Sequence, residues 1–539
     1  VYRGAAAAAR HYVEADRGRA DDYYLAEGTG IAQRYSASAN RSVTCEVPLT
    51  SDAYEAWVAG YDPVTGEAKG RLRNDANAVR FVEVSVNGPK SWSLAAELHP
   101  DISAAYDTAQ DGAARQVIGW LAQHATTRVG PRGDQIQVPV TEIDAVTVRH
   151  HTSRAGDPHR HLHLQINARV LAKGTWRGLH TVGVRDSIDA INGIGHAAMM
   201  TDPGFRQTLA QHGFTLDPSS GEVVELAEFV GPFSARAAQI GRHLDVYEAE
   251  WRAANPHAEP GPGLRRAWDR RAWADARPDK IVPRDGAMLT SRWVDELHAL
   301  GYRHQRGPVP TNASPIGHLD RDGAVREVLA RLSSRRSAWN VADIRGEVEQ
   351  LIARANIVTG PAVRLELAED LTARAVADCV PLLDRPGLPE HVRALTSPHV
   401  LEVEADLMSR LAARATTSPT CLEALATDAE DGLDPTQQEV VRTLAGDADL
   451  VVVEGAAGAG KTTTLAAARA RIEQHGGRLR VVTPTLKAAR VASQQVGGDA
   501  SSAASLAHQH GFRWHENGTW TRLRVGDIDP DTGAVYAGP

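Results

Sequence analysis

The chain has 539 residues, of which 42% are apolar and 23% are charged, and its formal net charge is −8. These values are ordinary for a globular protein of several domains, and they exclude nucleic-acid binding through a general excess of positive charge. No run of about 18 apolar residues is present, so insertion into a membrane is not expected. Three widely separated cysteines indicate neither disulfides nor a zinc site and favour a reducing cytoplasm.

The first half of the chain mixes helical and strand patterns. Residues 5–24 predict a helix interrupted near Gly18, and residues 81–87 and 161–170 alternate as strands do. Residues 234–255 and 264–277 predict two helices. Residues 320–425 are mostly helical, and from residue 448 the pattern changes to a strand, a glycine loop and a helix. We therefore expect an α+β protein with a nucleotide-binding segment near its end.

Five histidines lie within residues 150–163. In residues 161–167 polar and apolar side chains alternate, so His161 and His163 project from one face of a strand with their Cα atoms about 7 Å apart. Two such imidazoles and a third from a neighbouring strand would form a metal site. Neutral imidazole binds zinc, nickel or manganese readily and magnesium less readily. The alternative is that these histidines are merely solvated on an exposed sheet face.

The segment 148–167 resembles the metal motif of the MobF-family conjugative relaxases, which are HUH endonucleases. In that family a strand ends in His-x-Thr-Ser-Arg, and Asp-Pro and a second strand with His-x-His follow. The matching residues here are His150, Thr152, Ser153, Arg154, Asp157, Pro158, His161 and His163. The resemblance covers about residues 5–280 and implies an antiparallel sheet flanked by helices.

The third candidate ligand is either His150 or its neighbour His151. Strand alternation from Val146 and Val148 places His150 on the apolar side, which favours His151. The spacing of the family motif selects His150. We prefer His150 and keep His151 as the alternative.

The resemblance also implies a tyrosine nucleophile near the N-terminus. The candidates are Tyr12, Tyr23 and Tyr24, while His11 occupies one position of the first tyrosine pair of the family. A phenol whose ordinary pKa is about 10 needs a nearby cation or base to act. The alternative is that these rings belong to the core of an alanine-rich helix.

Residues 81–91 are similar to a family segment that carries an aspartate and ends in Pro-Lys-Ser. Glu83 stands at the aspartate position, where a carboxylate would orient an imidazole N–H or accept the tyrosine proton. The alternative is a surface glutamate on a half-buried strand. Lys90 and Arg154 are candidate contacts to DNA phosphates.

Residues 455–462 match the phosphate-binding pattern G-x-x-x-x-G-K-T, with a hydrophobic strand expected before it and an alanine-rich helix after it. Lys461 would reach the β- and γ-phosphates of ATP, and Thr462 would hold Mg²⁺. Residues 433–438 are similar to the adenine-reading motif of superfamily-one helicases, in which Gln437 or Gln438 would contact the base, and the spacing favours Gln437. The candidate nucleotide-binding residues are Gln437, Gly455, Ala456, Ala457, Gly458, Ala459, Gly460, Lys461, Thr462 and Thr463.

The resemblance implies three parts: a relaxase domain over residues 1–300, a helical accessory or linker subdomain over 301–425, and a partial RecA-like helicase domain over 426–539. No acidic Walker B strand follows the phosphate loop, so we expect a truncated fragment that binds ATP weakly or not at all and does not unwind DNA. The full-length protein would couple DNA nicking to ATP-dependent unwinding.

The expected function is site- and strand-specific nicking and rejoining of DNA through a 5′-phosphotyrosine in plasmid conjugative transfer. The cofactors would be a divalent metal ion (Mg, Mn, Zn or Ni) and ATP with Mg. The partners would be single-stranded and supercoiled DNA at a transfer origin, together with conjugation coupling and accessory proteins. The alternatives are an initiator of rolling-circle replication or transposition with the same site chemistry, and a non-catalytic DNA-binding scaffold.

Overall fold

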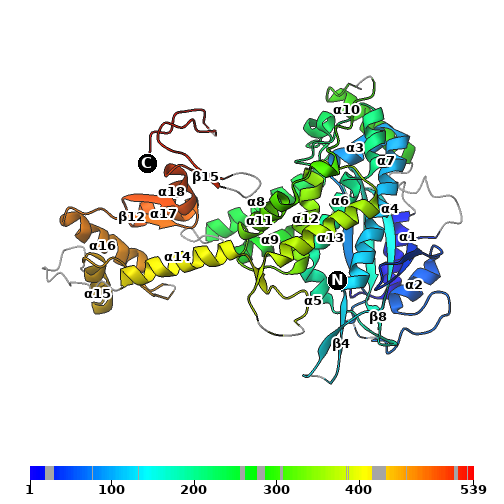
Figure 1. Ribbon diagram of the computed structural model, residues 1–539, viewed down its shortest axis with the longest axis horizontal. Helices are drawn as coiled ribbons and strands as arrows, with labels where there is room; N and C mark the ends of the chain where they lie inside the picture. Colours follow the sequence, from blue (N-terminus) through cyan, green and yellow to red (C-terminus); the bar gives the residue numbers. More distant parts are fainter. Residues whose placement is uncertain are drawn as a thin grey trace. The chain divides into compact units, whose positions relative to one another are not determined.

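The computed structural model describes residues 1–17, 30–73, 75, 77–131, 133–153, 155–254, 262–275, 286–303, 307–383, 385, 388–415, 432–456, 458–514, 520–530 and 532–539. The chain divides into two compact units (Figure 1). The first comprises residues 1–328 and 338–395, and the second comprises residues 329–337 and 396–539. The first unit therefore includes helices after residue 338, which pack on its sheet-bearing part.

The first unit is built on an antiparallel sheet, as expected from the family resemblance. Its described strands follow the order β2-β1-β6-β7-β3, and β8 and β9 extend it beside β6. The strands are β1 (Gln33–Ser38), β2 (Val43–Cys45), β3 (Phe81–Asn87), β6 (Glu142–Thr152), β7 (Pro158–Asn167), β8 (Arg169–Ala172) and β9 (Thr175–Gly178). The predicted strands at 81–87 and 161–170 are confirmed, although the second is divided at Ala168 into β7 and β8.

One face of the sheet packs on a layer of helices. This layer contains α3 (Lys90–Leu98), α4 (Pro100–His124), α6 (Ile188–Met200) and α7 (Pro203–Gln211), and α12 (Val341–Arg354) and α13 (Pro361–Ala377) lie outside it. Leu162, Leu164 and Ile166 of β7 are buried in this core. The helices α6 and α12 approach closely because both carry glycine: a Cβ at Gly193 would lie 2.6 Å from the carbonyl oxygen of Gly346.

The opposite face of the sheet is also covered. The helices α1 (Ala6–Arg17) and α2 (Ser51–Ala59) pack there, and Figure 1 shows them in blue on the side of the unit away from α12 and α13. Their core contains Val146 and Val148 of β6 together with Tyr54 and Trp57 of α2. The strand β6 is therefore buried on both faces.

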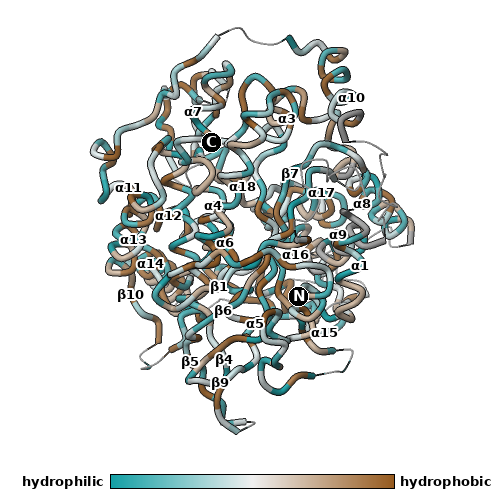
Figure 2. The backbone as a smooth tube through the Cα atoms, turned by 90° about the vertical axis from the view of Figure 1, so that its right-hand side faces the viewer, coloured by the Kyte–Doolittle hydropathy of each residue, from teal (hydrophilic) through white to brown (hydrophobic). Residues whose placement is uncertain are grey.

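The remaining elements of this part of the chain are mostly helical. They are β4 (Thr126–Val129), β5 (Ile136–Pro139), α5 (Thr181–Asp186), η2 (Val224–Phe229), α8 (Ala235–Ala254), α9 (Pro262–Asp275), α10 (Gly286–Ala299), η3 (Ile316–His318), α11 (Arg321–Ser333), β10 (Val380–Pro381) and β11 (Leu395–Thr396). Hydrophobic and hydrophilic segments alternate along the helices (Figure 2), as amphipathic helices require. The predicted helices at 234–255 and 264–277 are confirmed as α8 and α9.

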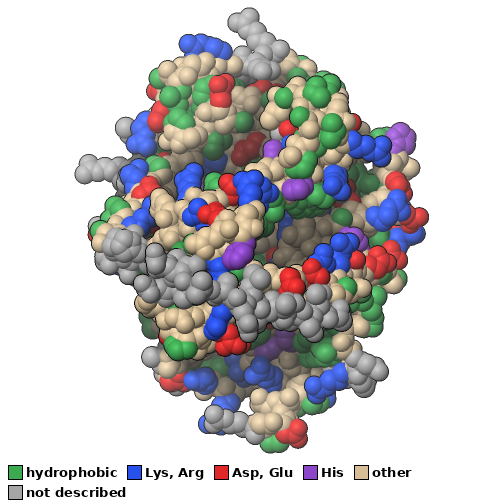
Figure 3. Space-filling model, turned by 90° about the vertical axis from the view of Figure 1, so that its left-hand side faces the viewer, with side chains coloured by type: hydrophobic (Ala, Val, Ile, Leu, Met, Phe, Trp, Pro, Cys, Tyr) green, Lys and Arg blue, Asp and Glu red, His purple; other side chains and the backbone are tan. Residues whose placement is uncertain are grey.

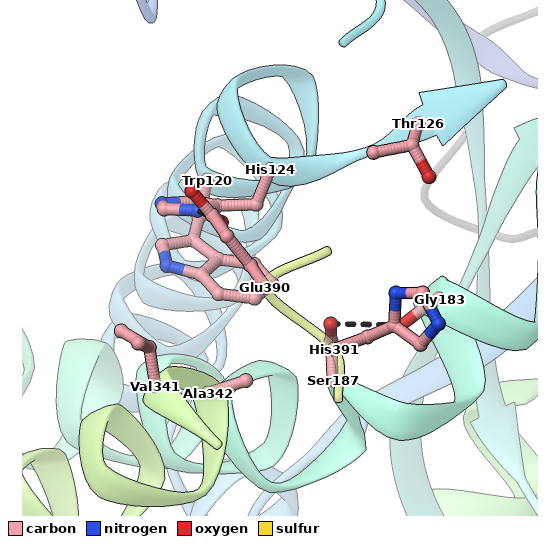
Figure 4. Close-up of a pocket in the computed structure, with 9 residues that line it drawn as sticks. All are labelled: Trp120, His124, Thr126, Gly183, Ser187, Val341, Ala342, Glu390 and His391. Carbon is pink, nitrogen blue, oxygen red and sulfur yellow. Dashed lines mark hydrogen bonds and ion pairs between the residues drawn. The ribbon is translucent and has the colours of Figure 1, made fainter. Parts of the chain in front are cut away.

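A small pocket lies where the end of α4 meets α5 and the starts of α6 and α12 (Figure 4). The ring of Trp120 stacks on His124, and Nδ1 of His124 lies 2.7 Å from a carboxylate oxygen of Glu390. The Ser187 hydroxyl donates a hydrogen bond to the carbonyl oxygen of Gly183. The contact between His124 and Glu390 attaches the segment around residue 390 to the end of α4.

The second unit contains short α/β elements. They are α14 (Pro398–Ala415), α15 (Pro435–Leu444), α16 (Lys461–Gln474), β12 (Arg480–Thr483), α17 (Leu486–Gln495), β13 (Asp499–Ser502), α18 (Ala503–Gln509), β14 (Phe512–Trp514) and β15 (Trp520–Arg522). The strands β12 and β13 are parallel, as in α/β domains. The strand expected before the phosphate loop is not formed: Val452 is 84% exposed, and none of the described strands pairs with residues 450–454.

None of the helices in the described part of the chain is long and apolar enough to cross a bilayer. On the face shown in Figure 3, Lys and Arg side chains are interspersed with Asp and Glu side chains. A nucleic-acid site on this protein therefore has to arise from local features.

Candidate metal centre

Three imidazoles meet on β6 and β7. His150 and His161 are directly paired across the two strands, and His163 lies two residues further along β7. The ring centroid of His150 lies 5.2 Å from that of His161 and 4.7 Å from that of His163. The ring centroids of His161 and His163 are 4.9 Å apart. One nitrogen from each ring lies within 4.8 Å of the others. The spacing and the donor type fit one divalent transition-metal ion with three imidazole ligands.

The position of His150 follows from the antiparallel register. Paired residues of neighbouring strands project to the same face, so Val148 and His150 share a face with His163 and His161. Strand alternation favoured His151 because the metal-binding face of β6 was expected to be polar. It is instead covered by α1 and α2 and buries Val146 and Val148 beside the imidazoles.

His151 projects to the other side of the sheet. The strand register shifts between His150 and Thr152, which marks a bulge at His151. The His151 ring lies 3.5 Å from the Arg160 guanidinium. Burial, together with Arg160 and Arg149, holds the pKa of His151 well below its usual range. The structure thus separates His151 from the three-imidazole cluster.

The tautomer of His161 is set by a backbone contact. Its Nδ1 lies 2.8 Å from the carbonyl oxygen of His159, and a carbonyl oxygen can only accept a hydrogen bond. Nδ1 therefore carries the proton, and Nε2 is the nitrogen with a lone pair for a metal. Burial lowers the pKa of the neighbouring His159 to about 4, with Lys90 and His163 adding to the effect, so His159 is a neutral ring stacked on His161.

A chain of polar groups connects His163 to the buried interior of α2. One Glu83 carboxylate oxygen lies 3.1 Å from Nδ1 of His163. The Gln165 side-chain amide donates a hydrogen bond of 2.9 Å to the other Glu83 oxygen. The Tyr54 hydroxyl donates one of 2.8 Å to the Gln165 oxygen. Burial raises the pKa of Glu83, but His163 and Gln165 outweigh it, and the net pKa is lowered. The carboxylate is therefore positioned to orient the imidazole of His163.

Sequence reasoning did not single out Gln165 or Tyr54. Gln165 belongs to the same alternation as His161 and His163, so its side of the strand was predictable. Tyr54 lies 111 residues away in sequence, and no local pattern indicates the contact.

The loop between β6 and β7 is held by its own side chains. The Ser153 hydroxyl donates to a carboxylate oxygen of Asp157 and accepts from the Asp157 backbone N–H. The Trp293 indole N–H of α10 donates to the carbonyl oxygen of Gly156. Arg154, the second candidate phosphate contact, lies outside the described residues.

Tyr12 lies beside the cluster on α1. Its ring centroid is 6.5 Å from that of His150, with the two planes inclined by 25°, and the residue is 41% exposed. Arg10 ties α1 to α2 through ion pairs with Asp52 and Glu55. The other two candidate nucleophiles, Tyr23 and Tyr24, lie outside the described residues.

Lys90 begins α3, and only Gly88 and Pro89 separate it from the end of β3. Burial lowers the pKa of Lys90 to about 8, although the carboxylate of Asp157 partly opposes the shift. A lysine with this pKa is only partly protonated at neutral to mildly alkaline pH.

The candidate phosphate loop of the second unit precedes α16. Gly460 has a φ of 70° and caps the helix, which places Lys461, Thr462 and Thr463 in its first turn. The Lys461 ammonium donates to the carbonyl oxygens of Gly455 and Ala456. Gln437 donates to the carbonyl oxygen of Ala459, so its side chain lies against the loop. Gly458 and Ala459 are exposed, and Ala457 lies outside the described residues.

Comparison with known proteins decides the family. Residues 6–300, more than half of the chain, match the model of the TrwC relaxase. The chain belongs to the TrwC relaxase family. Residues 432–531 match the model of an AAA domain, so this TrwC-family relaxase carries a helicase-like nucleotide-binding part. A comparison with curated proteins found no match.

Similar solved structures are complexes of the conjugative relaxase TrwC with oriT DNA. A metal-bound form is 22% identical, with a TM-score of 0.42, and the match covers 55% of this chain and 96% of that chain. A metal-free form is 22% identical, with a TM-score of 0.40, and the match covers 54% of this chain and 96% of that chain. TrwC in a complex with a 27-mer DNA comprising the recognition hairpin and the cleavage site is 20% identical, with a TM-score of 0.38. That match covers 50% of this chain and 92% of that chain.

Proposed function

We propose that this TrwC-family protein nicks and rejoins one DNA strand at a transfer origin, using a divalent ion held by His150, His161 and His163. The observation that carries the proposal is the convergence of these three imidazoles, one with its tautomer set by a carbonyl oxygen and one beside a carboxylate. The family match supports the substrate class.

A divalent ion bound there would withdraw negative charge from a DNA phosphate oxygen. The candidate nucleophiles are Tyr12, Tyr23 and Tyr24, of which Tyr12 lies beside His150. The phenolic oxygen forms a bond to phosphorus, the bond from phosphorus to the 3′ oxygen breaks, and the 3′ hydroxyl leaves with a proton. The protein then holds the DNA as a 5′-phosphotyrosine. Attack by a 3′ hydroxyl reverses these steps and rejoins the strand without ATP.

Other residues of the chain would bind and orient rather than react. Glu83, fixed by Gln165, orients His163. Lys90 and Arg154 would contact phosphates of the bound strand. In the second unit, Gln437 and residues 455–463 would bind ATP with Mg²⁺ and couple the relaxase to DNA unwinding in the full-length protein. Its partners would be the DNA of the transfer origin and the coupling and accessory proteins of conjugation.

The test uses a random-sequence pool of labelled single-stranded DNA incubated with the protein and Mn²⁺, Zn²⁺ or Ni²⁺. A covalent protein–DNA adduct that survives denaturation is expected, and sequencing its DNA identifies the target. The combined Tyr12→Phe, Tyr23→Phe and Tyr24→Phe variant should form no adduct. Tyr61→Phe is the matched control, because Tyr61 is similarly exposed at 40%. An adduct that persists in the triple variant would refute the tyrosine assignment.

Two alternatives remain distinguishable by the same assay. An initiator of rolling-circle replication or transposition would also form the adduct, but on a replication origin or transposon end. A non-catalytic scaffold would bind the DNA and form no adduct with any metal. The family match favours the relaxase over both.

A further inference from the structure

The helix α14 exposes an apolar stripe that the rest of the described chain leaves uncovered. The structure describes all 18 residues of this helix, which Figure 1 shows in yellow, and none of their side chains is buried. Val403, Leu407 and Leu411 recur every four residues and so share one face, with Met408 beside them. These four side chains are between 45% and 65% exposed. An amphipathic helix gains most of its stability by covering such a stripe, which therefore points to a partner.

A row of charged residues runs beside this stripe. Its members also recur every four residues and are exposed, and they are Glu402, Asp406, Arg410 and Arg414. The first two are acidic and the last two are basic. Within one chain, Arg410 forms an ion pair of 2.8 Å with Asp406. The apolar stripe is thus bordered by a row whose charge changes sign halfway along it.

This charged row is complementary to a reversed copy of itself. When two α14 helices run antiparallel and are centred on Met408, Asp406 of each lies opposite Arg410 of the other, and Glu402 lies opposite Arg414. Each contact then occurs twice, as two-fold symmetry requires. A parallel copy would instead place acidic residues beside acidic ones, which repel. The charges therefore favour a second copy of the same helix in the antiparallel direction.

We propose that α14 is the docking surface for a second copy of this chain, which binds it as an antiparallel helix pair. Val403, Leu407 and Leu411 of both copies would pack in the centre of the interface, and the charged rows would border it. One helix from each copy makes a small interface, so the dimer should be weak, with a Kd of about 1–100 µM. The inference goes beyond the proposed function and does not depend on it.

Sedimentation velocity of the full chain at increasing concentration tests the apolar part of the interface. The wild type should show a reversible equilibrium between monomer and dimer. Leu407→Gln removes an apolar side chain from the centre of the interface and should abolish the dimer. It should leave the free energy of unfolding of the monomer unchanged, because Leu407 is 54% exposed there. Val363→Gln is the matched control, since Val363 is an apolar residue of α13 that is 47% exposed.

Charge reversal tests the orientation. Asp406→Arg and Arg410→Asp should each weaken the dimer by about tenfold, because two symmetry-related pairs change from attraction to repulsion. An equal mixture of the two variants should dimerise about as strongly as the wild type, because each arginine of one variant then faces an aspartate of the other. Each helix of the mixture still carries like charges four residues apart, so the recovery can arise only between copies. Glu366→Arg, on the exposed surface of α13, is the control and should change nothing.

Three results would overturn the proposal. The first is a wild-type chain that stays monomeric at every concentration. The second is a mixture of the two charge variants that dimerises no better than either variant alone. The third is a lower free energy of unfolding for monomeric Leu407→Gln with no change in association, which would show that the stripe is covered within its own chain.

Discussion

Replacing Gln165 by methionine tests the polar chain that connects Tyr54 to the metal centre. Methionine keeps the length of the side chain but removes the donor to Glu83 and the acceptor for the Tyr54 hydroxyl. Tyr54 and Gln165 are both buried, so the Tyr54 hydroxyl loses its partner where water is scarce. A stranded buried hydroxyl costs about 1–3 kcal/mol. The lost bond to Glu83 adds about 1 kcal/mol, because this carboxylate is partly exposed and water can replace the amide.

The free energy of unfolding of the Gln165→Met protein should therefore be about 2–4 kcal/mol lower than that of the wild type. Urea denaturation without metal measures it. The double variant Tyr54→Phe/Gln165→Met should recover part of this loss, because no hydroxyl is then stranded. Metal affinity, measured by competition with a chromophoric chelator, should fall about tenfold as Glu83 loses its orientation. Unchanged stability together with unchanged metal affinity would refute the role given to Gln165.

Three further predictions concern other parts of the protein. Burial lowers the pKa of Lys90 to about 8, so affinity for single-stranded DNA should fall as the pH rises through 8 and the ammonium loses its proton. The Lys90→Arg variant should lose most of this pH dependence. A wild-type affinity that is constant from pH 7 to pH 9 would contradict a phosphate contact. His150→Ala should abolish binding of the divalent ion while His151→Ala leaves its stoichiometry unchanged, and the reverse result would reassign the third ligand. Lys461→Met should remove any binding of ATP with Mg²⁺ without affecting DNA adduct formation, since Lys461 lies in the second unit; a lost adduct would show that the two activities depend on each other.

The sequence allowed the strand that carries His161 and His163 to be predicted, because alternation along β7 directs its leucines to one helical layer and its histidines to the other face. Alternation alone did not predict which face of the neighbouring strand, β6, carries the third histidine. Alternation reports which side is apolar, and β6 is apolar on both sides because α1 and α2 cover Val146 and Val148. Only the register with β7 shows that His150 faces the other two imidazoles.

Long-range contacts explain the remaining differences. The Tyr54–Gln165–Glu83 chain joins three elements that are far apart in sequence, and no local pattern encodes it. The segment before the phosphate loop reads as a strand because it is apolar, but a strand also needs a neighbour, and among the described strands none pairs with it. Composition predicts the helices after residue 338 but not their packing partner, and the close approach of α12 to α6 depends on a glycine in each helix.

The central claim is that His150, His161 and His163 hold one divalent ion. Anomalous X-ray diffraction from crystals of the zinc- or nickel-loaded protein tests it most directly. The account predicts a single anomalous peak on this face of the sheet, about 2.0–2.3 Å from one nitrogen of each of the three rings. A peak coordinated by His151, or no peak at the cluster in fully loaded protein, would contradict it.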